Sequence, residues 1–230
     1  MKIISNDRLI NRNVQITKFA TAGSLIILAV GIYFSLTQAD KSSTVYITFA
    51  ALVLGFITSQ VSVYMQLRWG RSPRPDEIII AELKGLDDRH TLFVYRSVVP
   101  YLLVSPTGLW GLIPYHHEGT ISYSKDRFHQ KGGNTLRKLF GGDGLGRPDL
   151  DAKSNAEAFR KELSKRIPEL ASLNYQPVLV FTNPKTQLAC EDSPYPVIPT
   201  KKLKDFIRKK PGREALSPET LTLVAGKIQK

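Results

Sequence analysis

Cysteine is almost absent from this sequence, since Cys190 is the only one among 230 residues. A lone cysteine excludes a framework of internal disulfides and is typical of a chain kept in a reducing cytoplasm. The glycine-rich segment 141–146, GGDGLG, lacks the Gly-Lys-Ser/Thr ending of a phosphate-binding loop, and no strong strand precedes it. It therefore predicts a mobile loop and not a nucleotide site. No internal repeat is visible.

Charge is missing from two long runs near the N-terminus, Phe19–Gln38 and Thr44–Met65. A helix of 20 residues is about 30 Å long, which matches the hydrocarbon core of a bilayer. A cleaved signal peptide fits poorly, because 18 residues precede the first run and a second run follows at once. The short connector 39–43 only reverses the chain. We therefore predict a transmembrane helical hairpin with both ends on one side.

Positive charge flanks this hairpin on one side only. The connector holds Lys41 beside Asp40, so it carries no net charge. By the positive-inside rule both termini are expected in the cytoplasm, with the chain crossing the cell membrane twice and the lipid bilayer as a partner. The flanking cations are Lys2, Arg8, Arg12, Lys18, Arg68, Arg71 and Arg74.

The net charge of +12 divides evenly between the two parts of the chain. Residues 1–74 carry +6, which suits anchoring on anionic lipid, and residues 75–230 also carry +6. The second part is thus mildly basic, as a nucleic-acid or membrane-facing surface would be. We expect a basic cytoplasmic N-terminus at 1–18, two transmembrane helices within 19–66, a juxtamembrane linker at 67–75, a folded domain at 76–210 and a C-terminal tail at 211–230.

The part that follows the hairpin alternates helical and strand patterns, which predicts an α/β domain with a mixed sheet and flanking helices. A helix is expected over Asp76–Leu86, with acids in its first turn. Another is expected to begin at Ser154-Asn155 and to bury one apolar face. The glycine-rich stretch Lys125–Asp151 is expected to be a flexible excursion with a short helix at 134–140. The other expected elements are strands at 92–99, 102–104, 109–113, 119–123, 177–182 and 197–199, and helices at 201–208 and 218–228.

The specific feature of the domain is residues 98–121, VVPYLLVSPTGLWGLIPYHHEGTI. Two apolar runs flank Ser105-Pro106-Thr107-Gly108, which predicts two strands joined by a tight turn. Enzymes place acidic side chains at the ends of such hairpins, but here apolar residues and a tyrosine occupy those positions. Adjacent histidines at His116 and His117, beside Glu118, point to opposite faces of a strand, so a polar turn cluster is favoured over a metal site.

Several segments resemble the nuclease-related domain (NERD) family. Asp76–Leu86, DEIIIAELKGL, resembles the family's opening helix. Residues 99–115, VPYLLVSPTGLWGLIPY, are similar to its hairpin motif I-D-H-V-V-V-G-P-T-G-V-F-V-I-E-T-K, and Gly119 and Ile121 fit the G-x-I that follows. Residues 147–156, RPDLDAKSNA, resemble N-P-L-x-Q-A-x-x-N-A, and 177–181 resemble its late strand. The resemblance covers residues 76–210 in order and implies a restriction-endonuclease-like fold distantly related to PD-(D/E)xK nucleases.

In that chemistry an Asp and a Glu on adjacent strands hold Mg²⁺, and a Lys two residues after the Glu orients water. The resemblance places the Asp at Pro100, the Glu at Ile113 and the Lys at Tyr115. None of these three side chains can replace the metal-binding carboxylates or the lysine ammonium group. The helical Glu is retained as Glu77, and the later Gln falls on Asp151. The resemblance therefore implies a degenerate site with no metal and no cofactor.

The excursion supplies the candidates for nucleic-acid binding, and Tyr123, Phe128 and Phe140 are expected to offer stacking faces. The alternative for this segment is a solvated loop near anionic lipid headgroups. We predict a membrane-anchored, catalytically inactive domain that binds DNA, RNA or a protein partner. The alternatives are an active metal-dependent nuclease using Mg²⁺ at an altered site, and a structural scaffold of a membrane complex. The candidate cations are Lys125, Arg127, Lys131, Arg137, Lys138 and Arg147.

Overall fold

The structure is a computed structural model that describes residues 1–37, 42–133, 144–168, 173, 175–209 and 216–229. It divides into two compact units. One unit is the helical segment 7–74, and the other combines residues 1–6 with the described residues after Arg74. The chain is mixed α/β with two long apolar helices near its N-terminus, as the sequence predicted.

The helical unit contains α1 (Asp7–Thr37) and α2 (Ser42–Met65), followed by a π-helical turn at Gln66–Gly70. Both helices are long and apolar enough to cross a membrane. Helix α1 begins at Asp7 and not at Phe19, so most of the predicted basic segment 1–18 is helical. Asp7 lies in the first turn, where the helix dipole favours an acid, and the following stretch has no glycine or proline to end the helix.

Small and hydroxyl side chains join α1 to α2. The hydroxyl oxygens of Thr21 and Ser62 are 2.8 Å apart across the two helices. Gly31 lies against the side chain of Ala51, where an added Cβ would be 3.0 Å from it. Small residues allow close approach of two helices, and an interhelical hydrogen bond satisfies hydroxyls in apolar surroundings. The hairpin is therefore packed along its length.

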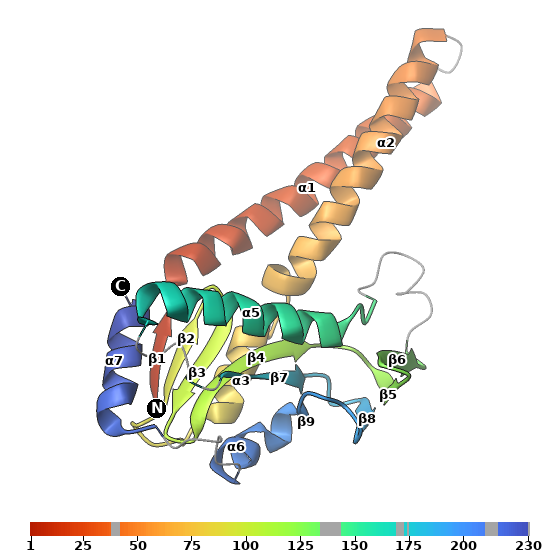
Figure 1. Ribbon diagram of the computed structural model, residues 1–230. Helices are drawn as coiled ribbons and strands as arrows, with labels where there is room; N and C mark the ends of the chain where they lie inside the picture. Colours follow the sequence, from red (N-terminus) through yellow and green to blue (C-terminus); the bar gives the residue numbers. More distant parts are fainter. Residues whose placement is uncertain (38–41, 134–143, 169–172, 174, 210–215, 230) are drawn as a thin grey trace. The chain divides into compact units, whose positions relative to one another are not determined.

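The domain is built on a six-stranded mixed sheet with the order β1-β2-β3-β4-β7-β9 (Figure 1). Strand β3 is antiparallel to both of its neighbours, β2 and β4, while β1 is parallel to β2, and β7 is parallel to both β4 and β9. The strands are β1 (Lys2–Ser5), β2 (Thr91–Val94), β3 (Tyr101–Ser105), β4 (Gly108–Tyr115), β7 (Tyr175–Phe181) and β9 (Val197–Pro199).

Strand β1 is a finding that the sequence did not predict. Residues 2–5 precede α1 in the chain, yet they pair with β2 from Lys2–Thr91 to Ser5–Val94. The backbone N–H of Lys2 donates to the carbonyl of His90 at 2.9 Å, and Ile4 packs against the core. The folded domain therefore contains chain from both sides of the helical unit.

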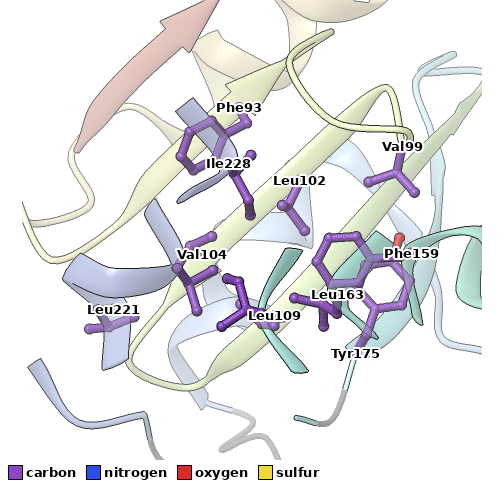
Figure 2. Packing of buried hydrophobic residues seen from close by; sticks show 12 residues of the cluster. Phe93, Val99, Leu102, Val104, Leu109, Phe159, Leu163, Tyr175, Leu221 and Ile228 are labelled. Atoms are coloured by element: carbon purple, nitrogen blue, oxygen red, sulfur yellow. The ribbon is translucent and has the colours of Figure 1, made fainter. Parts of the chain in front are cut away.

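Helix α5 (Pro148–Arg166) covers one face of the sheet together with α7 (Pro218–Gln229), as Figure 2 shows from their side chains. The predicted apolar face of α5 is confirmed, because Phe159 and Leu163 are buried there, and Ile167, just beyond the helix, is buried beside them. Residues 211–230 were expected to be a tail. Within this segment, the helix predicted at 218–228 is present as α7, which adds Leu221, Val224 and Ile228 to the core because these residues share one helical face.

Helix α3 (Pro75–Leu83) packs on α6 (Thr200–Lys209). Both helices were predicted, and α3 ends earlier than expected, with Gly85 at φ +88° just beyond it. Lys204 Nζ donates to the carbonyl of Lys84 at 2.7 Å, and Arg208 donates to that of Gly85 at 2.9 Å. These two α6 cations therefore cap the C-terminal end of α3.

A second, three-stranded sheet has the order β6-β5-β8, with β5 at Gly119–Ser124, β6 at Arg127–Lys131 and β8 at Thr186–Ala189. The predicted flexible excursion at Lys125–Asp151 is therefore wrong at both of its ends. Its start is strand β6, which pairs with β5. In β6 the exposed Arg127, His129 and Lys131 alternate with the buried Phe128 and the half-buried Gln130. Its end belongs to α5, which begins at Pro148 and not at Ser154, since proline suits the first helical position. The short helix expected at 134–140 lies outside the described residues.

The turn between β5 and β6 has two residues, Lys125 and Asp126, with φ of +51° and +56°. Positive φ at both central positions is the type I′ geometry that Asn-Gly adopts most readily. We expect the double substitution Lys125→Asn and Asp126→Gly to stabilise the domain by about 1 kcal/mol, because the left-handed conformation then carries less strain. Thermal unfolding of the full chain in detergent should show a higher Tm. Lys125→Val is the control and should lower it.

Strand β2 was predicted to continue to Val99 but ends at Val94, because Tyr95 has φ +54°. A buried carboxylate from α5 holds the loop that follows. Glu162 accepts hydrogen bonds from Ser97 Oγ at 2.5 Å and from the backbone N–H of Val98 at 3.2 Å, and it pairs with Arg166. A contact 65 residues away in the chain thus holds the loop that follows this strand.

Candidate functional site: the β3–β4 hairpin

The predicted hairpin is present, with β3 and β4 paired from Ser105–Gly108 to Leu102–Gly111. Its turn is held by polar side chains. Trp110 Nε1 donates to Ser105 Oγ at 3.0 Å, and Thr107 Oγ1 donates to the carbonyl of Ile207 in α6 at 3.2 Å. These bonds fix the turn on the domain, so the functional positions must be sought at the other end of the two strands.

Alternate residues of β4 face helix α5, because successive side chains point to opposite faces of a sheet. Leu109 belongs to the cluster that contains Phe159 of α5, and Tyr115 reaches Asp151 of α5. Ile113 lies between them on the same face. The two β4 positions at which the resemblance predicts loss of a Glu and a Lys therefore lie together with Asp151.

The hydroxyl of Tyr115 donates a hydrogen bond to Asp151 Oδ2 at 2.6 Å. Tyr115 is 9% exposed, and its ring stacks on Phe181 with centroids 5.5 Å apart. A short hydrogen bond to an ionised oxygen is strong, so it holds this carboxylate in place with a neutral partner. Two positions at which the resemblance implies a degenerate site thus meet in the fold, joined by a hydrogen bond.

A shallow depression of about 250 Å³ lies beside this pair. Its walls combine aliphatic and polar side chains, and Asp151 is the only ionisable side chain among the residues that line it. A hard divalent cation takes several oxygen ligands, whereas the side chains of this lining offer one carboxylate, the Ser154 hydroxyl and the Asn155 amide oxygen, the last of which already accepts from Tyr175. The lining residues are Val98, Val99, Ile113, Asp151, Ser154, Asn155 and Ala158.

Glu77, the retained acid of the resemblance, is an exposed residue of α3. Within the described ranges of the chain, no three His, Cys, Asp or Glu side chains are grouped closely enough to hold a metal ion. Glu77 and Asp151 are therefore not brought into such a group. Pro100, which stands where the resemblance places an Asp, instead accepts a hydrogen bond at its carbonyl from the N–H of Tyr95 at 2.7 Å.

The histidine pair follows β4 and does not form a metal site with Glu118 in the described structure. His116 Nδ1 is 2.8 Å from Thr182 Oγ1, which lies just beyond β7. His117 is 7% exposed and lies beside the ring of Tyr115, with centroids 6.1 Å apart. The two side chains thus have different surroundings, as alternation along a strand predicts, although burial of His117 was not expected of a turn.

Behind the depression, the Tyr175 hydroxyl donates a hydrogen bond to Asn155 Oδ1. Burial raises the pKa of Tyr175 far above its ordinary value, so the hydroxyl stays neutral and serves as a donor. The Tyr175 ring contacts Phe159 with centroids 4.4 Å apart. This hydroxyl also occupies the space beside Gly111 of β4. The polar groups here join helix to sheet and are not poised for proton transfer.

The cations predicted to bind nucleic acid lie in different parts of the structure. Lys125, Arg127 and Lys131 are exposed on the β5–β6 hairpin, while Arg137 and Lys138 lie outside the described residues. Arg147 forms an ion pair with Asp149 at 2.6 Å, and this carboxylate raises the pKa of the Arg147 guanidinium. Its charge is thus neutralised locally. Three of the six candidates share one hairpin.

Two residues that matter here were missed from the sequence. His129 lies between Arg127 and Lys131 on β6 and is exposed like them. Its signal was the alternation of RFHQK, in which every second residue is polar and basic. Glu162, which holds the loop after β2, carried no sequence signal, because its partners lie far away in the chain.

The comparisons with known proteins give no match: no family model matches the chain, and neither a curated protein nor a solved structure is significantly similar to it.

Proposed function

We propose that this chain is a membrane-anchored, nuclease-related domain that binds nucleic acid without cleaving it. The observation that carries the proposal is the hydrogen bond from Tyr115 to Asp151 at 2.6 Å. It lies where the resemblance would put a metal site and leaves one carboxylate beside the aliphatic side chain of Ile113. The order α3, β2, β3, β4, α5 and β7, which β5 and β6 of the small sheet interrupt before α5, is also consistent with the resemblance.

Anchoring is supported by the two apolar helices and by the pairing of β1 with β2. Because residues 2–5 and residues 91–94 lie in one sheet, a chain that crosses a membrane between them must return to the side from which it started. This supports a two-span hairpin with both connections to the domain on one side. The flanking cations favour the cytoplasm for that side, and the cell membrane as its location.

Nucleic acid is favoured over a protein partner by the charge of the β5–β6 hairpin. Arg127 and Lys131 are exposed there, and the residues after Arg74 carry a net charge of +6. Exposed cations supply the sequence-independent part of nucleic-acid binding through contacts with phosphate. The Asp151 depression is unsuited to the same task, since a carboxylate without a metal repels phosphate.

The proposal is tested with the full chain in nanodiscs of neutral lipid. Labelled single-stranded DNA, RNA and duplex DNA are incubated with it in millimolar Mg²⁺ or Mn²⁺, and both binding and product formation are measured. We expect salt-dependent binding and no cleavage, because the site lacks the oxygen ligands that hold a catalytic cation.

Two variants make this assay decisive. Asp151→Asn keeps a hydrogen-bond acceptor for Tyr115 and removes the charge, while Glu157→Gln removes an exposed charge elsewhere on α5 as a matched control. Cleavage that is lost in Asp151→Asn and kept in Glu157→Gln would establish the active nuclease instead. Absence of any binding to DNA or RNA would leave the chain as a scaffold.

A further inference from the structure

The three-stranded sheet β6-β5-β8 has two faces of opposite character. Its inner face is apolar: Ile121 is 0% and Phe128 is 7% exposed, and both belong to the cluster that contains Tyr115. Tyr123 packs on Phe128 with ring centroids 4.9 Å apart. The aromatic side chains expected to stack on bases are therefore used to attach this sheet to the domain. Phe140, the third of them, lies outside the described residues.

The other face, called the outer face here, is polar and basic. Directly opposed residues of neighbouring strands share a face, so the register assigns its members. Arg127, His129 and Lys131 of β6 are all exposed on it. Their partners on β5 are Ser124, Ser122 and Thr120, and β8 adds Gln187 and Ala189. Thr120 Oγ1 donates to Gln187 Oε1 at 3.3 Å across the sheet, which agrees with this assignment.

The chemistry of the outer face is that of an anion-binding surface. Among the described strand positions that make up this face, none is acidic, and the nearest acid in sequence is Asp126 in the turn. Alternate residues of a strand are about 6.7 Å apart, so Arg127 and Lys131 stand roughly 13 Å apart. This length corresponds to about four nucleotides of one DNA strand at a rise of roughly 3.4 Å.

We propose that this outer face, centred on Arg127, His129 and Lys131, binds the phosphodiester backbone of a nucleic-acid strand. The inference rests on the proposed function and names the surface that performs it. The hydroxyls of Ser122 and Ser124 on β5 lie beside the cations, where they serve as neutral donors to phosphate oxygens. Since the described positions of the face hold no Phe, Tyr or Trp side chain, the contact is mainly to the backbone and reads no sequence.

The location of this face explains how the domain would bind a nucleic-acid strand without cleaving it. The inner face of the same sheet packs on Tyr115, so the outer cations point away from the Tyr115–Asp151 pair. A strand held by Arg127 and Lys131 is therefore kept on the side of the small sheet opposite to the degenerate hairpin positions. The outer face and the Tyr115–Asp151 pair thus lie on separate surfaces of one domain.

The test uses the full chain in nanodiscs of neutral lipid and a labelled 20-nucleotide poly(dT) strand as the probe. The double variant Arg127→Gln and Lys131→Gln removes two charges from the outer face. Two lost phosphate contacts lower the slope of log K against log salt by about 1.4, which weakens binding on the order of 20-fold at roughly 0.1 M salt. Arg127→Lys alone keeps the charge and should keep most of the affinity.

The matched control is Lys201→Gln with Lys202→Gln, which removes two exposed charges from α6. It should bind poly(dT) like the unchanged chain, and an equal loss in both double variants would overturn the assignment of this face. If the unchanged chain binds poly(dT) and the Arg127/Lys131 variant binds equally well, the surface is wrong while the proposed function stands. If the unchanged chain binds only added phosphatidylserine vesicles and no oligonucleotide, both fail.

Discussion

A fragment that begins at Pro75 is expected to aggregate, whereas the same fragment joined behind residues 1–6 by a flexible linker is expected to be a soluble monomer. The reason is the pairing of β1 with β2. All four residues of β2, Thr91–Val94, are buried, and without β1 its row of backbone N–H and carbonyl groups becomes an open edge. An apolar strand edge of this kind pairs with other molecules.

Size-exclusion chromatography of the two proteins, matched in concentration, measures this effect. Proline substitutions in the joined protein provide a sharper comparison. The N–H groups of Lys2 and Asn6 donate to the carbonyls of His90, just before β2, and of Val94. The alternation of the ladder therefore directs the N–H of Ile4 toward β2 and that of Ile3 outward. Ile4→Pro should therefore cause aggregation, and Ile3→Pro should be tolerated. A monomeric fragment from Pro75 would show that β1 is dispensable.

Gly111→Ala is expected to destabilise the domain by about 3 kcal/mol through overpacking, which lowers Tm by roughly 6–12 °C. A Cβ at this position would overlap both the hydroxyl oxygen and the ring carbon Cζ of Tyr175 and would lie 2.8 Å from Asn155 Oδ1. Tyr175 cannot move aside easily, because it is 3% exposed and its ring contacts Phe159.

A second substitution at Tyr175 tests this cause. Tyr175→Phe removes only the hydroxyl and leaves Cζ in place, so it should not rescue Gly111→Ala. Tyr175→Val removes the whole ring, and in that background Gly111→Ala should cost close to nothing. Thermal unfolding of the full chain in detergent, followed by circular dichroism, measures the three single and two double variants. An undiminished cost of Gly111→Ala in the Tyr175→Val chain would show that another contact is responsible.

The parts of the fold that the sequence predicted well are those with strong local patterns. The β3–β4 hairpin has apolar runs around a proline and glycine turn, and α6 has an apolar stripe that ends at Ile207. The parts that were missed depend on distant chain. Strand β1 has four residues, and its partner β2 begins at Thr91, so nothing local identifies it. Strand β6 carried a visible alternation, but the glycines that follow it favoured a flexible loop.

The candidate site was likewise predictable from the sequence only in part. The absence of acids at Pro100, Ile113 and Tyr115 can be read directly from the sequence. That Tyr115 then bonds to Asp151, 36 residues later, depends on how α5 packs on the sheet. The outer face required the register of three strands, of which β8 gave no sequence signal. Pairings of this kind are tertiary properties, which single-residue patterns do not encode.

The position of β1 also orders events during biogenesis. As the polypeptide leaves the ribosome, Lys2–Ser5 emerges before either apolar helix, and its partner Thr91–Val94 emerges only after both. The first strand of the sheet must therefore wait, unpaired, while the two helices are synthesised and placed. The domain can therefore be completed only after both helices have been made. A chain truncated among them cannot assemble this sheet.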